Sequence, residues 1–229
     1  MENSLAALDT TTIDENLVGS ISQILNEHGI PSVQWGNYLL TLYGVPSIVD
    51  SIDFIVPDSL IPNATHALQP TGLLACTEPS TCTAIAKNRA SPIPKSHFHI
   101  DSEFTVSLYE QSTTLWVLPS LTQSTQSVDI ISASDSRLPT KRPGRGHGRF
   151  RNTTFPVQIP TAHRLLESYV RSIAIARRGS YVGFFLDMIT YVEEHVDGDG
   201  LLDVSGLEGR CREFYEGFIG FRKTYYCAS

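Results

Sequence analysis

The sequence predicts an α+β fold, in which a mixed β-sheet flanked by helices is followed by a C-terminal helical subdomain. Up to about residue 135, segments with the two-residue period of strands alternate with segments that have helical spacing. After Pro160 only helical spacing recurs. The chain has 229 residues, of which 41% are hydrophobic, so it can bury one substantial core. Strands mixed with helices, then helices alone, indicate the α+β class.

The first elements are predicted from capping signals and periodicity. Residues 12–15 (Thr-Ile-Asp-Glu) form a capping-box pattern, apolar residues follow at helical spacing to Leu25, and Gly29 ends the helix. A strand is then expected at residues 31–35, a turn at Gly36-Asn37, a helix over 37–43 and a strand over 51–56.

The middle of the chain gives mixed signals. The pattern predicts a helix over 57–68, weakened by Pro62, a short buried strand over 72–77, and no clear element over 80–89. Further strands are predicted over 97–109, 114–118 and 127–132.

Four regions follow from this organisation. Residues 1–11 form a flexible N-terminus, residues 12–135 the α+β core, and residues 136–160 a basic loop and connector rich in glycine and proline. Residues 161–229 form the helical subdomain, with helices expected around 165–175, 184–192 and 214–219.

The bulk composition narrows the class of protein. The net charge is −7, which argues against a general nucleic-acid-coating protein. The N-terminus lacks the features of a secretory signal, and no apolar run of about 18 residues could span a membrane. Four scattered cysteines fit no zinc-binding spacing, and we expect them to be reduced thiols in a cytoplasmic protein.

The Gly36-Asn37 turn, followed by an acidic strand, resembles the nucleotidyltransferase superfamily, and in particular the small stand-alone members found in fungi. The resemblance implies that Gly36 and Asn37 line a triphosphate. It also implies that two carboxylates, two residues apart on the next strand, share Mg²⁺. Asp53 occupies the second of these positions, but Ser51 occupies the first. Asp50 could substitute only if a bulge rotated it onto the same face.

A third carboxylate is expected on a later strand. Residues 96–101 (Ser-His-Phe-His-Ile-Asp) place His97, His99 and Asp101 on one face. The resemblance therefore implies Asp53 and Asp101 as metal ligands, and these two with His99 as catalytic residues. The alternative is that the three alternating polar residues simply face solvent.

The one basic concentration lies in residues 137–151. Glycines are interleaved there with bases that include Arg142, Arg145 and Arg149. Guanidinium groups hold phosphate bidentately, so we predict these three as phosphate contacts. A solvated loop is the alternative explanation.

Three functions remain open at this point. The resemblance implies transfer of a nucleotidyl group from a nucleoside triphosphate to a small-molecule or macromolecular acceptor. Because Ser51 removes one bridging ligand, the cleft could instead serve acid–base chemistry by Asp53 and His99 on a small substrate, as in a biosynthetic cyclase or isomerase. A non-catalytic ligand-binding pseudoenzyme is the third reading. The sequence does not predict an oligomeric state.

Overall fold

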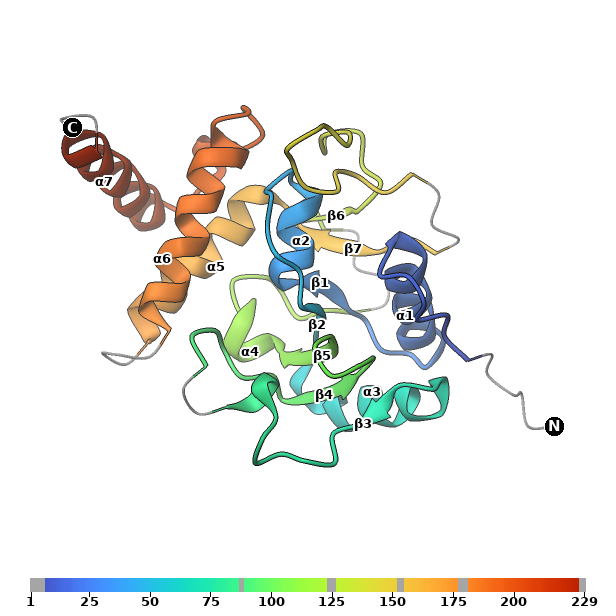
Figure 1. Cartoon of the computed structure of the whole chain (residues 1–229). Coiled ribbons are helices and arrows are strands. Elements are labelled where there is room, and N and C mark those ends of the chain that lie inside the picture. Colours follow the sequence, from blue (N-terminus) through green and yellow to red (C-terminus); the bar gives the residue numbers. More distant parts are fainter. Residues whose placement is uncertain (1–6, 87–88, 123–126, 152–154, 177–180, 227–229) are drawn as a thin grey trace.

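A five-stranded mixed sheet forms the centre of the protein (Figure 1). The computed structural model describes residues 7–86, 89–122, 127–151, 155–176 and 181–226. The strand order is β1-β2-β5-β4-β3, and only β2 and β5 run parallel. The strands are β1 (Val33–Trp35), β2 (Ser51–Val56), β3 (Leu74–Ala75), β4 (Ser96–His99) and β5 (Thr105–Glu110).

Helices flank this sheet, and a two-stranded sheet, β6 (Ile130–Ser132) with β7 (Gln158–Pro160), lies beside it. The helices of the first part are α1 (Glu15–Glu27), α2 (Gly36–Leu42), α3 (Ile61–Leu68) and α4 (Gln111–Thr114). The C-terminal helices are α5 (Ala162–Ile175), α6 (Val182–Tyr191), the π-helix η4 (Val192–Asp197) and α7 (Gly209–Tyr226). Short 3₁₀ turns are η1 (Asp58–Leu60), η2 (Gln69–Thr71), η3 (Thr83–Ile85) and η5 (Val204–Gly206). This arrangement confirms the predicted α+β class.

The two faces of the sheet differ in chemistry. On one face Ile52, Val106 and Phe98 align across β2, β5 and β4, and all three are buried. Helix α3 packs on β4 and β5, and the Thr65 hydroxyl donates to the Ser96 hydroxyl at 2.9 Å. The register places the polar side chains together on the opposite face, in the rows Asp53–Ser107–His97 and Ser51–Thr105–His99.

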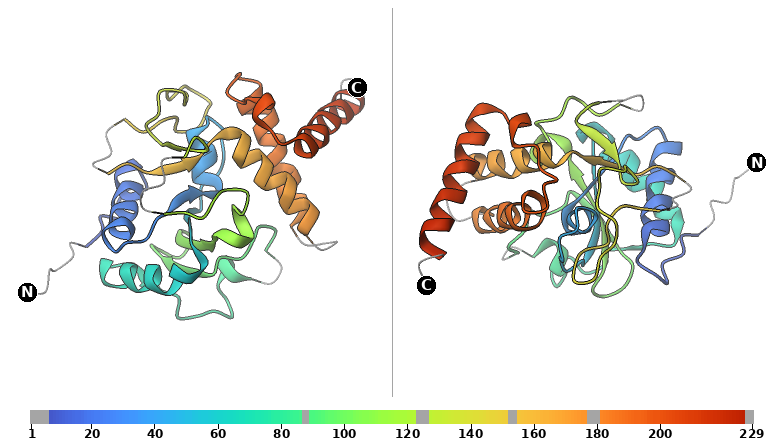
Figure 2. Two further views of the ribbon diagram at one scale, coloured as in Figure 1. Left: turned by 180° about the vertical axis from the view of Figure 1, so that it is seen from behind. Right: turned by 90° about the horizontal axis from the view of Figure 1, so that it is seen from above.

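The C-terminal helices attach to the body through aromatic rings. Tyr169 of α5 lies 5.3 Å from Trp35 of β1 and 6.2 Å from Phe185 of α6, centroid to centroid. Helix α7 packs on α5 at the end of the molecule away from α1 (Figure 2). Within the described residues, no helix combines the length and apolar character needed to cross a membrane.

The predicted helix near the N-terminus is confirmed, with a different cap. Asp14, not Thr12, caps α1, because its carboxylate accepts the backbone N–H groups of Asn16 at 2.9 Å and Leu17 at 3.1 Å. Gly29, at φ 75°, ends the helical segment as expected.

Three strand predictions need correction. Residues 97–109 form not one strand but the hairpin β4–β5, since a turn at 100–104 interrupts them without disturbing the alternation. Residues 114–118 begin with the last residue of the short helix α4 and contain no strand. The strand predicted as buried over 72–77 is reduced to β3, whose two residues are exposed because β3 is an edge strand.

Candidate functional site

A cleft of about 550 Å³ opens beside the polar face of the sheet. Its described lining residues come from residues 35–53, from Thr83 and residues 89–92, from Tyr109 of β5 and from helix α6. Its charged lining residues are Asp50, Asp53 and Arg89, the last being the one cation among the described residues that line it.

Asp53 lies at the floor of this cleft with only 5% of its surface exposed. The Ser51 hydroxyl donates to its Oδ2 at 3.0 Å, while its buried Oδ1 has no hydrogen-bond partner among the described residues. Burial raises the pKa of Asp53 to about 7, although the hydrogen bond from Ser51 and the charge of Arg89 favour the ionised form. A buried acceptor without a donor is costly, so this oxygen is suited to an external cation or proton donor.

Gly36 begins α2 directly against this carboxyl group. Its φ of 71° lies in the left-handed region, and a Cβ built there would stand 2.0 Å from Asp53 Oδ2. The absent side chain therefore makes room for the Asp53 carboxyl. The resemblance had implied another role for Gly36, namely that it lines a bound triphosphate.

Asp50 brings a second carboxylate to the cleft without a bulge. It precedes β2, whose pairing with β5 begins at Ser51, so the strand's alternation does not fix its direction. The Ser51 hydroxyl lies 3.4 Å from Asp50 Oδ1 and 3.0 Å from Asp53 Oδ2. Two carboxylates therefore converge on one hydroxyl, and the negative charge of Asp50 contributes to the raised pKa of Asp53.

This donor set fits Mg²⁺. The ion is usually held by one or two carboxylates, with water and substrate phosphates completing its octahedron. Asp53 offers its unpartnered Oδ1, and Asp50 offers an exposed carboxylate from the rim. Ser51, at the position where the resemblance implied an acid, contributes a hydroxyl that donates to Asp53 and lies 3.4 Å from Asp50 Oδ1.

Arg89 is a functional candidate that the sequence reasoning missed. It lines the cleft and contributes to the electrostatic environment of Asp53. Its guanidinium donates to the backbone oxygen of Ala84 at 3.3 Å and its Nε bonds to Ser91. The segment over 80–89 gave no period from which this placement could be predicted, although Arg89 is its one arginine.

Helix α6 supplies a wall that the sequence also left unassigned. Phe184, Met188 and Tyr191 line the cleft from this helix. Their helical spacing predicted α6 but not which other part of the chain α6 faces.

The structure separates Asp101 from Asp53. Asp101 Oδ1 accepts the backbone N–H groups of Glu103 and Phe104, each at 2.7 Å, and these bonds lower its pKa. It lines a second hollow of about 670 Å³, while Asp53 lines the first. The expected sharing of one ion by Asp53 and Asp101 is therefore not met, because the turn between β4 and β5 uses Asp101 as its cap.

The two histidines of β4 do not line the Asp53 cleft. His97 and His99 share a sheet face with Asp53, but their Nε2 atoms lie 3.3 Å and 3.6 Å from Cys82 Sγ. His99 lines the second hollow together with Asp101 and does not line the first. The expectation that His99 acts beside Asp53 is thus not supported by this placement.

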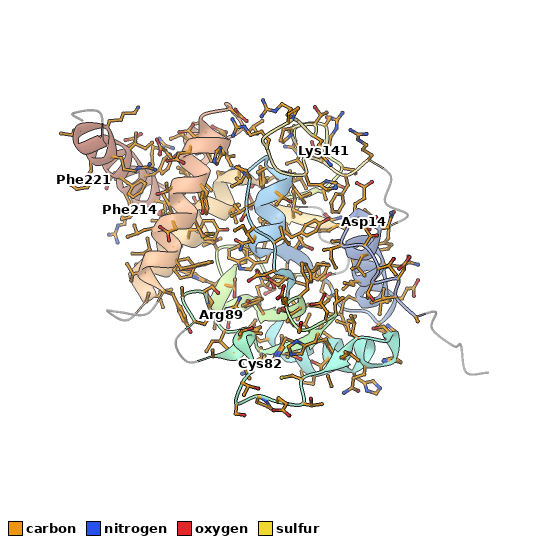
Figure 3. The ribbon with its side chains drawn as sticks, viewed as in Figure 1. Asp14, Cys82, Arg89, Lys141, Phe214 and Phe221 are labelled. Atoms are coloured by element: carbon orange, nitrogen blue, oxygen red, sulfur yellow. The ribbon has the colours of Figure 1, made fainter. Side chains whose placement is uncertain are left out.

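The basic loop does not reach the cleft either. Arg142 and Arg145 both form ion pairs with Asp199, and Arg149 donates to the Ser136 backbone oxygen at 3.3 Å. Figure 3 shows Lys141 of this loop in the upper part of the molecule and Arg89 in the lower part. Among the residues predicted to bind a cofactor, Gly36 and Asn37 line the cleft, and the three arginines do not.

Comparisons with known proteins add little to this geometry. No protein-family model matches the chain, and no curated protein matches it. A solved structure of the antibiotic-resistance factor ANT(2'')-Ia, a nucleotidyltransferase, aligns over 91% of this chain and 90% of that chain. The identity is 13% and the TM-score 0.39, a likeness too low to define either the fold or the function of this protein.

Proposed function

We propose that this protein is nucleotidyltransferase-like and that the Asp50–Asp53 cleft binds a nucleoside triphosphate with Mg²⁺. The convergence of two carboxylates on the Ser51 hydroxyl, with Asp53 Oδ1 left unpartnered, carries the proposal. The reaction would be transfer of the nucleotidyl group to a small hydroxyl- or amine-bearing acceptor.

The lining residues divide the cleft by chemistry. Asp50 and Asp53 would hold Mg²⁺, which when bound neutralises phosphate charge and orients the transferred group. Arg89, on the facing wall, can hold a phosphate oxygen with its guanidinium. Phe184 and Tyr191 offer apolar surface for a nucleotide base.

The electrostatics support a ligand that brings its own cation. Without one, the neutral form of Asp53 is favoured well above the usual pH range of a carboxyl group, since burial raises its pKa to about 7. A divalent cation beside the carboxylate favours the ionised form, so binding of the ion should release a proton from Asp53 near pH 7.

Titration calorimetry with Mg²⁺ and each of the four nucleoside triphosphates tests the proposal. Asp53→Asn should weaken binding about 10- to 100-fold, because it removes a charged ligand worth about 1.5–3 kcal/mol. Asp50→Asn should weaken it in the same direction. Asp187→Asn is the matched control, since Asp187 is an exposed acid on α6 that does not line the cleft. Equal affinities for Asp53→Asn and Asp187→Asn would refute the proposal.

Acid–base catalysis by Asp53 on a small organic substrate is the second candidate. A pKa of about 7 poises a carboxyl group for proton transfer near neutral pH, and this observation favours the alternative. The two functions differ in their need for metal. Turnover of a substrate that persists in excess chelator, with a pH profile lost in Asp53→Asn, would support the alternative over nucleotidyl transfer.

A further inference from the structure

A second cluster of side chains lies on the far part of the same sheet face. One ligand atom from each of Cys76, Cys82, His97 and His99 can be chosen so that all four lie within 4.8 Å of one another. Cys82 Sγ lies 3.3 Å from His97 Nε2 and 3.6 Å from His99 Nε2. The imidazole rings meet edge to face at 5.2 Å.

These spacings match those of a tetrahedral zinc site. Zn–S bonds of about 2.3 Å and Zn–N bonds of about 2.0–2.1 Å place sulfur and nitrogen about 3.6 Å apart in a tetrahedron. The two measured sulfur–nitrogen distances, 3.3 and 3.6 Å, lie close to that separation. Two thiolates and two imidazoles are also the donor types that zinc prefers.

The fold explains how the four side chains meet. His97 and His99 alternate along β4, so both project from one face. Cys76 follows β3, whose Ala75 pairs with Phe98 between the two histidines. Cys82, directly before η3, is the fourth member of the cluster. Its side chain is buried, whereas the other three are partly buried.

We propose that Cys76, Cys82, His97 and His99 bind one structural Zn²⁺, which ties the segment after β3 to strand β4. Each cysteine gives up its thiol proton to solvent on binding, so the pair supplies two negative charges to the ion. Four protein ligands complete the tetrahedron and leave no open position for a substrate, which is typical of a structural site. The spacing Cys-x₅-Cys…His-x-His differs from the usual finger patterns, so the sequence alone did not indicate it.

The site has a consequence for the first cleft. Directly after Cys82 the chain supplies Thr83 and, further on, Arg89 to the cleft wall. Figure 3 shows Cys82 and Arg89 in the same lower part of the molecule. A metal at the cluster therefore anchors one end of the segment that carries Arg89.

Metal analysis of the reduced full-length protein, purified without chelator from zinc-supplemented medium, tests the proposal. We expect about one zinc per chain. Protein stripped by chelator should bind one equivalent of Co²⁺ and show the intense visible absorption of tetrahedral cobalt with thiolate charge transfer. Absence of zinc in the purified protein together with no Co²⁺ uptake would overturn the proposal, and so would a Cys76–Cys82 disulfide that persists in the reduced preparation.

Variants assign the ligands. Cys82→Ser and His97→Ala should each lose the tetrahedral cobalt spectrum, whereas Cys211→Ala and His28→Ala, a cysteine and a histidine outside the cluster, should retain it. Retention of the spectrum in Cys82→Ser would refute the assignment. If a ligand variant fails to fold, the wild-type Co²⁺ titration still decides. None of these readouts uses nucleotide, so their failure would leave the proposed function of the Asp53 cleft untouched.

Discussion

Replacing Gly36 by alanine should destabilise the protein far more than the same change at a comparable glycine. Gly36 and Gly144 have nearly the same backbone conformation, with φ of 71° and 70°. A Cβ at Gly144 meets nothing within 4 Å, whereas a Cβ at Gly36 would lie 2.0 Å from Asp53 Oδ2 and 3.0 Å from its Cγ. Comparing the stability losses of Gly36→Ala and Gly144→Ala therefore distinguishes the cost of backbone strain from the cost of steric conflict.

The magnitudes follow from these two contributions. Left-handed backbone at alanine costs about 1–2 kcal/mol, and this cost applies at both positions. Overpacking adds about 1–3 kcal/mol at Gly36 alone, because a buried carboxyl must move. For a chain of this size each kcal/mol lowers Tm by about 2–4 °C, so the melting temperature of Gly36→Ala should fall below that of Gly144→Ala by about 2–12 °C.

Thermal unfolding followed by circular dichroism measures the difference. In an Asp53→Ala background the conflicting carboxyl is absent, so Gly36→Ala should then cost about as much as Gly144→Ala. Equal melting temperatures for Gly36→Ala and Gly144→Ala in the wild-type background would refute the close packing of Gly36 on Asp53.

Three further outcomes follow from charged side chains. Burial raises the pKa of Asp53 to about 7 in the folded state, from 3.8 in the unfolded state. Between these pH values the folded state binds a proton that the unfolded state releases, so the stability of the wild type falls as pH rises through this window. The melting temperature of Asp53→Asn should lack that decline and exceed that of wild type above pH 7. Glu167 is fully buried, and its carboxylate accepts from Arg164 and from the backbone N–H of Glu208, so Glu167→Ala should cost about 1–3 kcal/mol in denaturant unfolding, and an unchanged stability would contradict these hydrogen bonds. Arg89→Ala should weaken nucleotide binding, measured by calorimetry, because Arg89 lines the cleft. Arg142→Ala should leave it unchanged, because the Arg142 guanidinium pairs with Asp199; the reverse order would indicate that the basic loop binds the phosphates.

Local signals in the sequence were enough to predict much of the fold. The strand predicted over residues 51–56 agrees with β2 at both ends, because its four apolar residues, Ile52, Phe54, Ile55 and Val56, suit a strand that is buried on both faces. The first helix was predictable from its apolar spacing and from Gly29, although its N-cap is Asp14 and not Thr12. The hairpin in 97–109 was not, since both of its strands keep the same alternation through the turn that Asp101 caps.

Only the part of the cleft formed by residues 36–53 was predictable from the sequence. Gly36 and Asp53 were identified because a turn and the following strand are local features, joined within twenty residues of sequence. Arg89 and the face of α6 belong to segments that meet them only through tertiary packing, which no periodicity encodes. Asp50 was discounted on strand alternation, an argument that applies only inside a strand, and β2 begins one residue later.

The walls of the cleft belong to segments that lie far apart along the chain. Residues 35–53 include the floor, residues 89–92 add a wall, and helix α6 adds another with residues 184–191. During synthesis on the ribosome, the acidic floor is therefore made well before helix α6, which lines the same cleft. The cleft beside Asp53 takes its final form only after residues 184–191 have been synthesised and have docked.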